Sequence, residues 1–410
     1  MSASPQDFLA VSHPQATPHA NTAGYSKHSQ PRLAKDWFYH PELDAIRLFL
    51  FFGVWAYHAL PKDAGFYVLH HLPPPLAWVI TGIIKAGMCS LDVFFILSAF
   101  LITELLLRER ESRGVVDLKA FYIRRLLRIW PLYFFVIALA AVLSIVDRSQ
   151  PVGWAYALAF LLFSGNWMMV LHGLPGASII VPLWSVSFEE QFYLLWPLAL
   201  RSISRTTIVR VVIGLLVVAA VARFILLLEH QGPERIWFNS LARLDSIAFG
   251  ILLAVIFHGR ALLRIGLPAR LALLLAGISA WVVVGHYCGL ADPITPLVGG
   301  MIGYPLMSLG GVAIFLSVLG AARDGAPFMR NSLLVYLGKI SFGLYAYHLL
   351  GLRFSNYLFG DFNRFGSLLS WVFALAFTFL LAIVSFKWLE GPFLRLKRSK
   401  FTHIPSGPAC

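Results

Sequence analysis

The sequence predicts an all-α fold, a polytopic transmembrane helical bundle. Of its 410 residues, 58% are hydrophobic and only 13% are charged, and the mean hydropathy is +0.73. A soluble protein averages about 25% charged and roughly 45–50% apolar residues. A water-soluble monomer cannot bury so much apolar surface, so the composition excludes a soluble enzyme, a disordered chain and a coiled coil. The 33 Phe, 12 Trp and 14 Tyr fit helices with aromatic ends at the bilayer interfaces.

The charge and the cysteines exclude other classes of protein. The net charge is +13, which in a soluble chain suggests nucleic-acid binding. Here the Lys and Arg residues fall in short loops between apolar runs, a pattern that indicates membrane orientation and anionic headgroups instead. We therefore expect a lipid bilayer and no nucleic acid as partner. Cys89, Cys288 and Cys410 offer neither a disulfide framework nor metal-ligand spacing, and no metal is expected.

Eleven apolar runs supply the candidate membrane segments. Several are shorter than the ~20 residues that a spanning helix needs. The runs lie at 44–60, 86–107, 126–146, 152–171, 183–200, 207–228, 243–258, 268–286, 298–321, 332–353 and 367–388.

Basic loops predict which of these runs cross the membrane. Lys and Arg cluster at 108–128, 201–210, 260–270, 323–330 and 395–400, and such loops are usually cytoplasmic. Only one crossing then fits between an external loop at 147–151 and the basic loop at Arg201, although that stretch contains two runs. One of the two is therefore re-entrant or interfacial, with a cavity wall near 165–185. We expect about ten spanning helices, this re-entrant segment, and both termini in the cytoplasm.

The chain divides into one membrane domain and two tails. Residues 1–40 are rich in Ser, Pro, His and Gln and contain no sustained apolar run, which predicts a disordered cytoplasmic tail. Residues 41–395 form the predicted transmembrane domain, without an internal repeat. Residues 396–410 are the predicted cytoplasmic C-terminal tail.

Two ionisable residues share one face of the first apolar run. Ionisable groups at membrane depth are costly, so each is a candidate functional residue. Eleven residues separate Arg47 from His58, which is about 20° past three full helical turns and ~16 Å along the axis. Arg47 then lies near the cytoplasmic end and His58 towards the outside. A snorkelling arginine and an interfacial histidine are the alternative interpretation.

Two further clusters follow. Lys85 and Asp92 are seven residues apart, and Asp92 could pair with Lys85 or with the first helix, as a structural ion pair or as part of a site. Arg124, Arg125 and Arg128 follow on the third run. They are interpreted as a clamp for phosphates at the cytoplasmic mouth, because arginine matches phosphate oxygens bidentately. Ordinary positive-inside anchoring also accounts for them.

The remaining clusters place polar groups inside apolar runs. In 184–197, Glu189 and Glu190 are followed by Gln191, and Ser185 lies one helical turn before Glu189. Two adjacent carboxylates are hard to explain as lipid-facing residues. Another cluster joins the late runs, where the last three members form one helical stripe: Arg243, Asp245, Ser341, Tyr345 and His348.

In this order, the clusters resemble the acyltransferase-3 family of integral membrane O-acyltransferases, over roughly residues 38–395. The matching elements are 43–47 with His58, 91–98, the arginines of 124–128, 184–193, 243–250, 341–348 and 390–392. Ala99 departs from the usual glycine of the family. The hydrolase-like periplasmic domain that often follows this region in the family is not expected in this chain.

The resemblance implies transfer of an acyl group, commonly acetyl from acetyl-CoA, to a hydroxyl. Typical acceptors in the family are cell-surface polysaccharides, peptidoglycan, lipid-linked sugars and macrolide-type natural products, and the expected location is the cell (inner) membrane. His58 matches the essential histidine of the family and Arg47 its partner arginine. A sugar hydroxyl attacking a thioester needs a base, and histidine has a suitable pKa range.

We therefore expect His58 to act as general base, with Arg47 and Glu189 as its catalytic companions. Arg47 would line the donor path, and Glu189 would orient a histidine or bind acceptor hydroxyls. The other assignments are an acyl-CoA site at Arg124, Arg125, Arg128 and Asp92, and substrate or oxyanion candidates Ser185, Gln191, Arg243, Ser341, Tyr345 and His348.

Three alternatives remain open. A covalent acyl-histidine would replace direct transfer. A secondary transporter could use the same Arg, Asp and His residues as a relay, although it predicts inverted repeats. A subunit that moves the acyl group across the bilayer for a separate enzyme would use every residue named above.

Overall fold

The computed structural model describes residues 39–146, 152–176, 178–260, 264–360 and 368–401, and every regular element among them is a helix. The described residues from Tyr39 onwards belong to one compact unit. Its elements are α1 (Pro41–Ala59), α2 (Ala64–Leu69), α3 (Pro74–Ala86), η1 (Gly87–Cys89), α4 (Ser90–Arg113), α5 (Leu118–Val146), α6 (Trp154–Leu161), α7 (Gly165–His172), α8 (Leu183–Leu200), α9 (Arg205–Leu228), α10 (Pro233–Trp237), η2 (Leu241–Arg243), α11 (Leu244–Phe257), α12 (Leu267–Tyr287), α13 (Leu297–Val318), α14 (Ala321–Asp324), η3 (Pro327–Arg330), α15 (Ser332–Lys339), α16 (Ser341–Phe359), α18 (Leu368–Ser385), η4 (Phe386–Glu390, a π-helical turn) and α19 (Gly391–Phe401). The all-α prediction is confirmed.

Six helical stretches among the described residues are long and apolar enough to cross a membrane. They are Pro74–Arg113, Leu118–Val146, Arg205–Leu228, Leu267–Tyr287, Leu297–Val318 and Leu368–Leu396. The pair α15 and α16, bent by 65°, makes a seventh if it counts as one span. The predicted number of about ten is thus not confirmed. Of the other runs, α1 carries Glu42, Asp44 and Arg47, and α11 has only 14 residues.

The charge pattern predicts that one of the runs 152–171 and 183–200 crosses the membrane incompletely, and the structure interrupts the run at 152–171. Its two helices, α6 and α7, have eight residues each. Each therefore rises about 12 Å, less than half of a hydrocarbon core of about 30 Å. Between them, Phe163 has a φ of 53°, a backbone conformation that cannot continue a right-handed helix. A re-entrant path for this segment remains a prediction.

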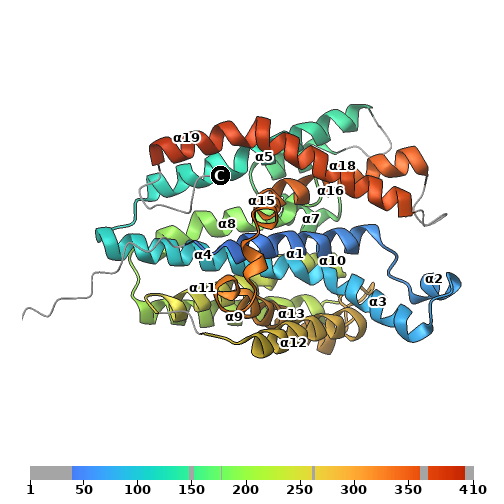
Figure 1. Ribbon diagram of the computed structural model, residues 1–410, viewed down its shortest axis with the longest axis horizontal. Helices are drawn as coiled ribbons and strands as arrows, with labels where there is room; N and C mark the ends of the chain where they lie inside the picture. The colour runs from blue at the N-terminus through green and yellow to red at the C-terminus, as the bar shows by residue number, and fades with distance from the viewer. Residues whose placement is uncertain (1–38, 147–151, 177, 261–263, 361–367, 402–410) are drawn as a thin grey trace, which may run out of the picture. The chain divides into compact units, whose positions relative to one another are not determined.

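Helix α1 lies among α3, α4, α15 and α16 (Figure 1). Its C-terminal half is held by a close backbone approach to η1. A Cβ atom on Gly87 would lie 2.2 Å from the carbonyl oxygen of Gly53, so only glycine fits at this crossing. The last two turns of α1, which carry His58, are therefore positioned by backbone contact.

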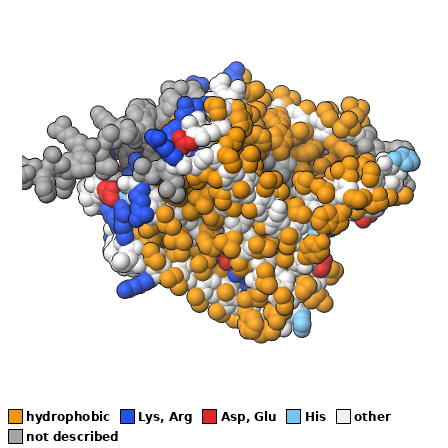
Figure 2. Space-filling model, turned by 60° about the horizontal axis from the view of Figure 1, so that its bottom comes forward, with side chains coloured by type: hydrophobic (Ala, Val, Ile, Leu, Met, Phe, Trp, Pro, Cys, Tyr) orange, Lys and Arg blue, Asp and Glu red, His pale blue; other side chains and the backbone are white. Residues whose placement is uncertain are grey.

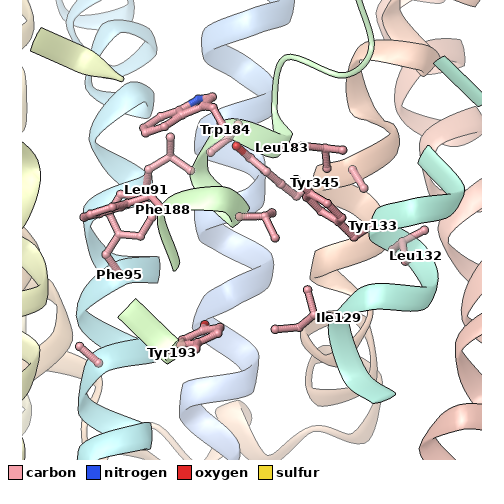
Figure 3. Packing of buried hydrophobic residues seen from close by; sticks show 14 of the residues in the cluster. Leu91, Phe95, Ile129, Leu132, Tyr133, Leu183, Trp184, Phe188, Tyr193 and Tyr345 are labelled. Carbon is pink, nitrogen blue, oxygen red and sulfur yellow. The ribbon is translucent and has the colours of Figure 1, made fainter. Parts of the chain in front are cut away.

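Aromatic packing fills the space between α4, α5, α8 and α16. Phe95 and Phe188 meet edge to face, with ring centroids 4.9 Å apart at 87°. Figure 3 shows Trp184 on the same side as these rings, and Tyr345 beside Tyr133 on the other. These side chains belong to one buried hydrophobic cluster, which holds the polar residues of α8 against its neighbours.

The visible surface agrees with a membrane location. In Figure 2, hydrophobic side chains cover most of the face, and most Lys and Arg side chains gather towards one end. With the apolar helices, this distribution indicates a multi-pass membrane protein. Most of the two predicted tails, residues 1–38 and 402–410, lies outside the described residues. Residues 396–401 of the predicted C-terminal tail belong to α19.

Candidate active site

Helix α1 carries the two residues that the sequence singles out, near its two ends. The Arg47 guanidinium donates to the Asp44 carboxylate, with Nη1 2.9 Å from Oδ1, and its side chain is 15% exposed. His58 lies in the last turn and is exposed. Neither ring nitrogen of His58 has a hydrogen-bond partner among the described residues. Its imidazole is therefore free to meet a substrate.

A second histidine lies beside His58. The rings of His58 and His348 have centroids 5.0 Å apart and are tilted by 48°. His348, on α16, is fully buried, and its Nδ1 lies 2.5 Å from the carbonyl oxygen of Tyr345. Its Nε2 has no hydrogen-bond partner. Of the predicted helical stripe at 341–348, it is therefore His348 that contacts His58, the predicted base.

An arginine cluster forms from side chains of α1 and α5, within electrostatic range of α8. Arg128 is exposed, forms no hydrogen bond or ion pair with any described residue, and lies within electrostatic range of Arg47 and Arg125. The same three guanidinium groups act on the carboxylate of Glu189. The Tyr193 hydroxyl donates to Glu189, with OH 2.9 Å from Oε2. Three cations that converge in this way form a favourable site for a polyanion.

Arg124 points elsewhere. Its Nη2 lies 3.4 Å from Oε2 of Glu109 at the end of α4, and the Glu109 side chain is buried. Arg125 packs its guanidinium over the ring of Tyr193, 5.2 Å from the centroid. The structure therefore gathers Arg125 and Arg128 of the predicted clamp around Arg47 and places Arg124 against α4.

The hydroxyl groups of Ser185 and Tyr345 fasten α8 to α16. Tyr345 donates to the carbonyl oxygen of Pro182 at 2.8 Å, and its hydroxyl oxygen is 2.8 Å from Oγ of Ser185. The two hydroxyl groups thus hydrogen-bond to the carbonyl oxygen of Pro182 and to one another. Ser341 begins α16 at the bend, about 10 Å of helix rise before His348. Of these three residues, Tyr345 contacts the histidine pair, with its ring centroid 5.6 Å from that of His348.

Gln191 belongs to a polar network that holds the interrupted segment. Its side-chain amide donates to the carbonyl oxygen of Phe163 and to Asn166, both at 2.9 Å, and accepts from Ser240 at 2.7 Å. Asn166 is fully buried and also donates to the carbonyl oxygen of Phe238. Because its amide is saturated by protein partners, Gln191 positions α7 on α8. Asn166 was missed, although an amide inside an apolar run is itself a signal.

Asp92 pairs with Arg243, and not with Lys85 or with α1. Arg243 Nη2 lies 2.8 Å from Oδ2 of Asp92, and both side chains are almost completely buried. Ser246 and Ser308 also donate to this carboxylate, Ser308 at 3.0 Å. Asp92 and Arg243, predicted in two different clusters, thus form one buried ion pair between α4 and η2.

Asp245 has a partner that sequence reasoning missed. Arg223 of α9 is 1% exposed and donates to Asp245, with Nη2 3.1 Å from Oδ1. Tyr304 lies between the two buried arginines, 5.8 Å from the guanidinium of Arg223 and 5.3 Å from that of Arg243. An arginine in the middle of an apolar run was the available signal. No group of three or more His, Cys, Asp or Glu in the described ranges could hold a metal ion.

Together, these residues define two parts of the candidate active site, which are called its two halves. One half is the arginine cluster of Arg47, Arg125 and Arg128, which suits a polyanion. The other half is the histidine pair of His58 and His348, which suits proton transfer. Arg47 and His58 lie ~16 Å apart along the same helix, so a long substrate with phosphates at one end could contact both halves.

The comparisons with known proteins identify the family. An acyltransferase domain family, Acyl_transf_3, matches residues 40–387. The chain is 25% identical to the peptidoglycan O-acetyltransferase OatA of Listeria monocytogenes over 374 residues, covering 86% of this chain and 56% of the relative. It is also 25% identical to the O-acetyltransferase OatA of Staphylococcus aureus over 382 residues, covering 90% and 59%.

The chain spans less than three-fifths of the length of these two relatives. No solved structure matches it. The family match covers most of the chain, including both halves of the candidate site up to His348. The chain therefore belongs to the Acyl_transf_3 family of acyltransferase domains.

Proposed function

We propose that the protein is a membrane O-acetyltransferase that moves an acetyl group from acetyl-CoA to a hydroxyl of a carbohydrate, glycolipid or natural-product acceptor. The proposal rests on the observation that one helix, α1, bears both Arg47 of the polyanion site and the exposed imidazole of His58, about 16 Å apart along its axis. Acetyl-CoA has this layout, since its phosphates and its thioester are separated by the pantetheine arm. The family membership supports the same chemistry.

In the proposed reaction, His58 takes the proton of the acceptor hydroxyl while its oxygen attacks the thioester carbonyl. The carbon–sulfur bond then breaks, and the imidazolium returns the proton to the CoA thiolate. The products are the acetyl ester and free CoA, so protons and electrons balance. Arg47, Arg125 and Arg128 hold the phosphates, and Glu189 balances their charge. The basic end faces the cytoplasm of the inner membrane, with both termini on that side.

Among acceptors, a peptidoglycan glycan is the first to test, because one relative is named for that substrate. Purified protein in lipid nanodiscs, supplied only with acetyl-CoA and muropeptides, should yield muropeptides heavier by one acetyl group in mass spectrometry. Glycolipids and macrolides replace the muropeptide in parallel reactions. If none is acetylated, but vesicles containing the protein accumulate labelled acetyl groups in their lumen, the acyl-translocating alternative is correct. Failure of both assays would leave the transporter alternative.

The donor site gives a separate expectation. Arg128→Ala should raise the KM for acetyl-CoA about 10- to 100-fold, because a hydrogen bond to a charged group contributes about 1.5–3 kcal/mol. With S-acetyl-pantetheine, which has no phosphates, wild type and variant should have equal KM values. Arg113→Ala, which removes an exposed arginine at the end of α4, is the matched control and should change neither value. Equal effects of Arg128→Ala on both donors would exclude a phosphate contact.

A further inference from the structure

The fully buried His348 carries a nitrogen without a partner. Its Nδ1 lies 2.5 Å from the carbonyl oxygen of Tyr345, and a carbonyl oxygen can only accept. Nδ1 of His348 therefore carries the proton. In the neutral ring, Nε2 is then a bare acceptor, and it has no hydrogen-bond partner although the residue is 0% exposed. An unsatisfied buried acceptor costs about 1–3 kcal/mol.

In its neutral form, His348 cannot donate to an oxyanion. A neutral imidazole has a single N–H, and that of His348 is used by Tyr345. The ring has no second N–H to donate to an oxyanion. What it offers is an oriented acceptor, which is the arrangement of a base or of a residue that holds another base.

The group best placed to use this acceptor is His58. The two ring centroids are 5.0 Å apart. Two imidazoles joined by an N–H···N hydrogen bond of about 2.9 Å also have centroids about 5 Å apart. The His58 ring has no competing partner among the described residues, and rotation about its Cβ–Cγ bond is soft. A turn of this ring, without movement of α1 or α16, would bring an N–H of His58 onto Nε2 of His348.

We infer that His348 is the positioning residue of His58: it accepts a hydrogen bond from one nitrogen of His58 and so leaves the other nitrogen as the base that faces the hydroxyl. This inference rests on the proposed function. The pair of imidazoles then does what a carboxylate and an imidazole do in a catalytic triad, where the third group fixes the tautomer. The hydroxyl proton stays on His58 until the CoA thiolate takes it.

Substitution of His348 tests the inference in the full-length protein in nanodiscs, with acetyl-CoA and the acceptor that the wild type acetylates. His348→Ala should lower kcat about 10²-fold and leave the KM values for both substrates within about twofold, since a wrong tautomer impairs only the chemical step. His348→Gln, whose amide oxygen reaches the place of Nε2, should have a kcat at least tenfold higher than that of His348→Ala. His172→Ala, which removes an exposed histidine at the end of α7, is the control and should behave as wild type.

A spectroscopic measurement separates positioning from structural support. Solid-state NMR of the protein labelled with ¹⁵N-histidine should show His58, assigned by its loss in His58→Ala, as one tautomer in wild type and as a mixture in His348→Ala. Wild-type kcat in His348→Ala overturns the inference, as does a raised KM for the acceptor or an unchanged His58 tautomer. Full activity of His58→Ala would instead overturn the proposed function, so the two failures are distinguishable.

Discussion

His58→Ala should lower kcat for acetyl transfer by about 10²- to 10⁴-fold, the usual contribution of a positioned general base. The reason is the place of this side chain: it is exposed, has no hydrogen-bond partner among the described residues, and lies at the far end of the helix that bears Arg47. The KM for acetyl-CoA should change little, because the predicted phosphate contacts are remote. Initial rates with purified protein in nanodiscs provide both constants.

His58→Gln extends the test. It keeps a polar side chain of similar size but has no basic nitrogen, so it should be as inactive as His58→Ala. Both variants should keep a melting temperature close to that of wild type, since the His58 side chain is exposed and its ring forms no hydrogen bond with a described residue in the structure. Transfer at the wild-type rate by either variant would exclude His58 as the base.

Most of the helices could be predicted from the sequence, because an apolar run in a membrane must satisfy its own backbone. The charges of the flanking loops predict that one of the runs 152–171 and 183–200 crosses incompletely, but they do not say which. The structure interrupts the first of them, between α6 and α7. The number of spanning helices could not be predicted. Helix α1 shows why: its apolar run is a candidate segment, but with Glu42, Asp44 and Arg47 the helix is not among those apolar enough to cross a membrane. Its environment depends on packing against α15 and α16.

The candidate site, like the fold, could be predicted from the sequence only in part. Arg47 and His58 share one helix, so helical periodicity alone places them on one face. Partners on different helices are not encoded by periodicity. Asp92 lies 151 residues before Arg243, and the sequence offered Lys85 as a nearer cation. Which of Arg124, Arg125 and Arg128 join Arg47 in the polyanion site likewise depends on the face that α5 turns towards α1 and α8. That face is set by tertiary packing.

Asp92→Ala should destabilise the protein by about 3–5 kcal/mol, because it leaves the buried Arg243 without its counter-ion. Replacing the whole pair, as in Asp92→Leu with Arg243→Met, should recover most of that loss, since well-packed apolar residues often substitute for a buried ion pair. Asp324→Ala removes a partner of the exposed Arg323 and should change the free energy of unfolding by less than about 1 kcal/mol. Unfolding in detergent by heat or denaturant measures all three variants.

A further variant, Asp92→Asn, decides what Asp92 does. If it binds acetyl-CoA, as its place in the sequence suggested, Asp92→Asn should raise the KM for the donor and leave stability nearly unchanged. The buried contacts to Arg243, Ser246 and Ser308 lead us to expect the opposite result, a lower melting temperature with the donor KM of wild type. The carboxylate already accepts three hydrogen bonds from protein groups at 0% exposure, so a donor phosphate would meet only its negative charge.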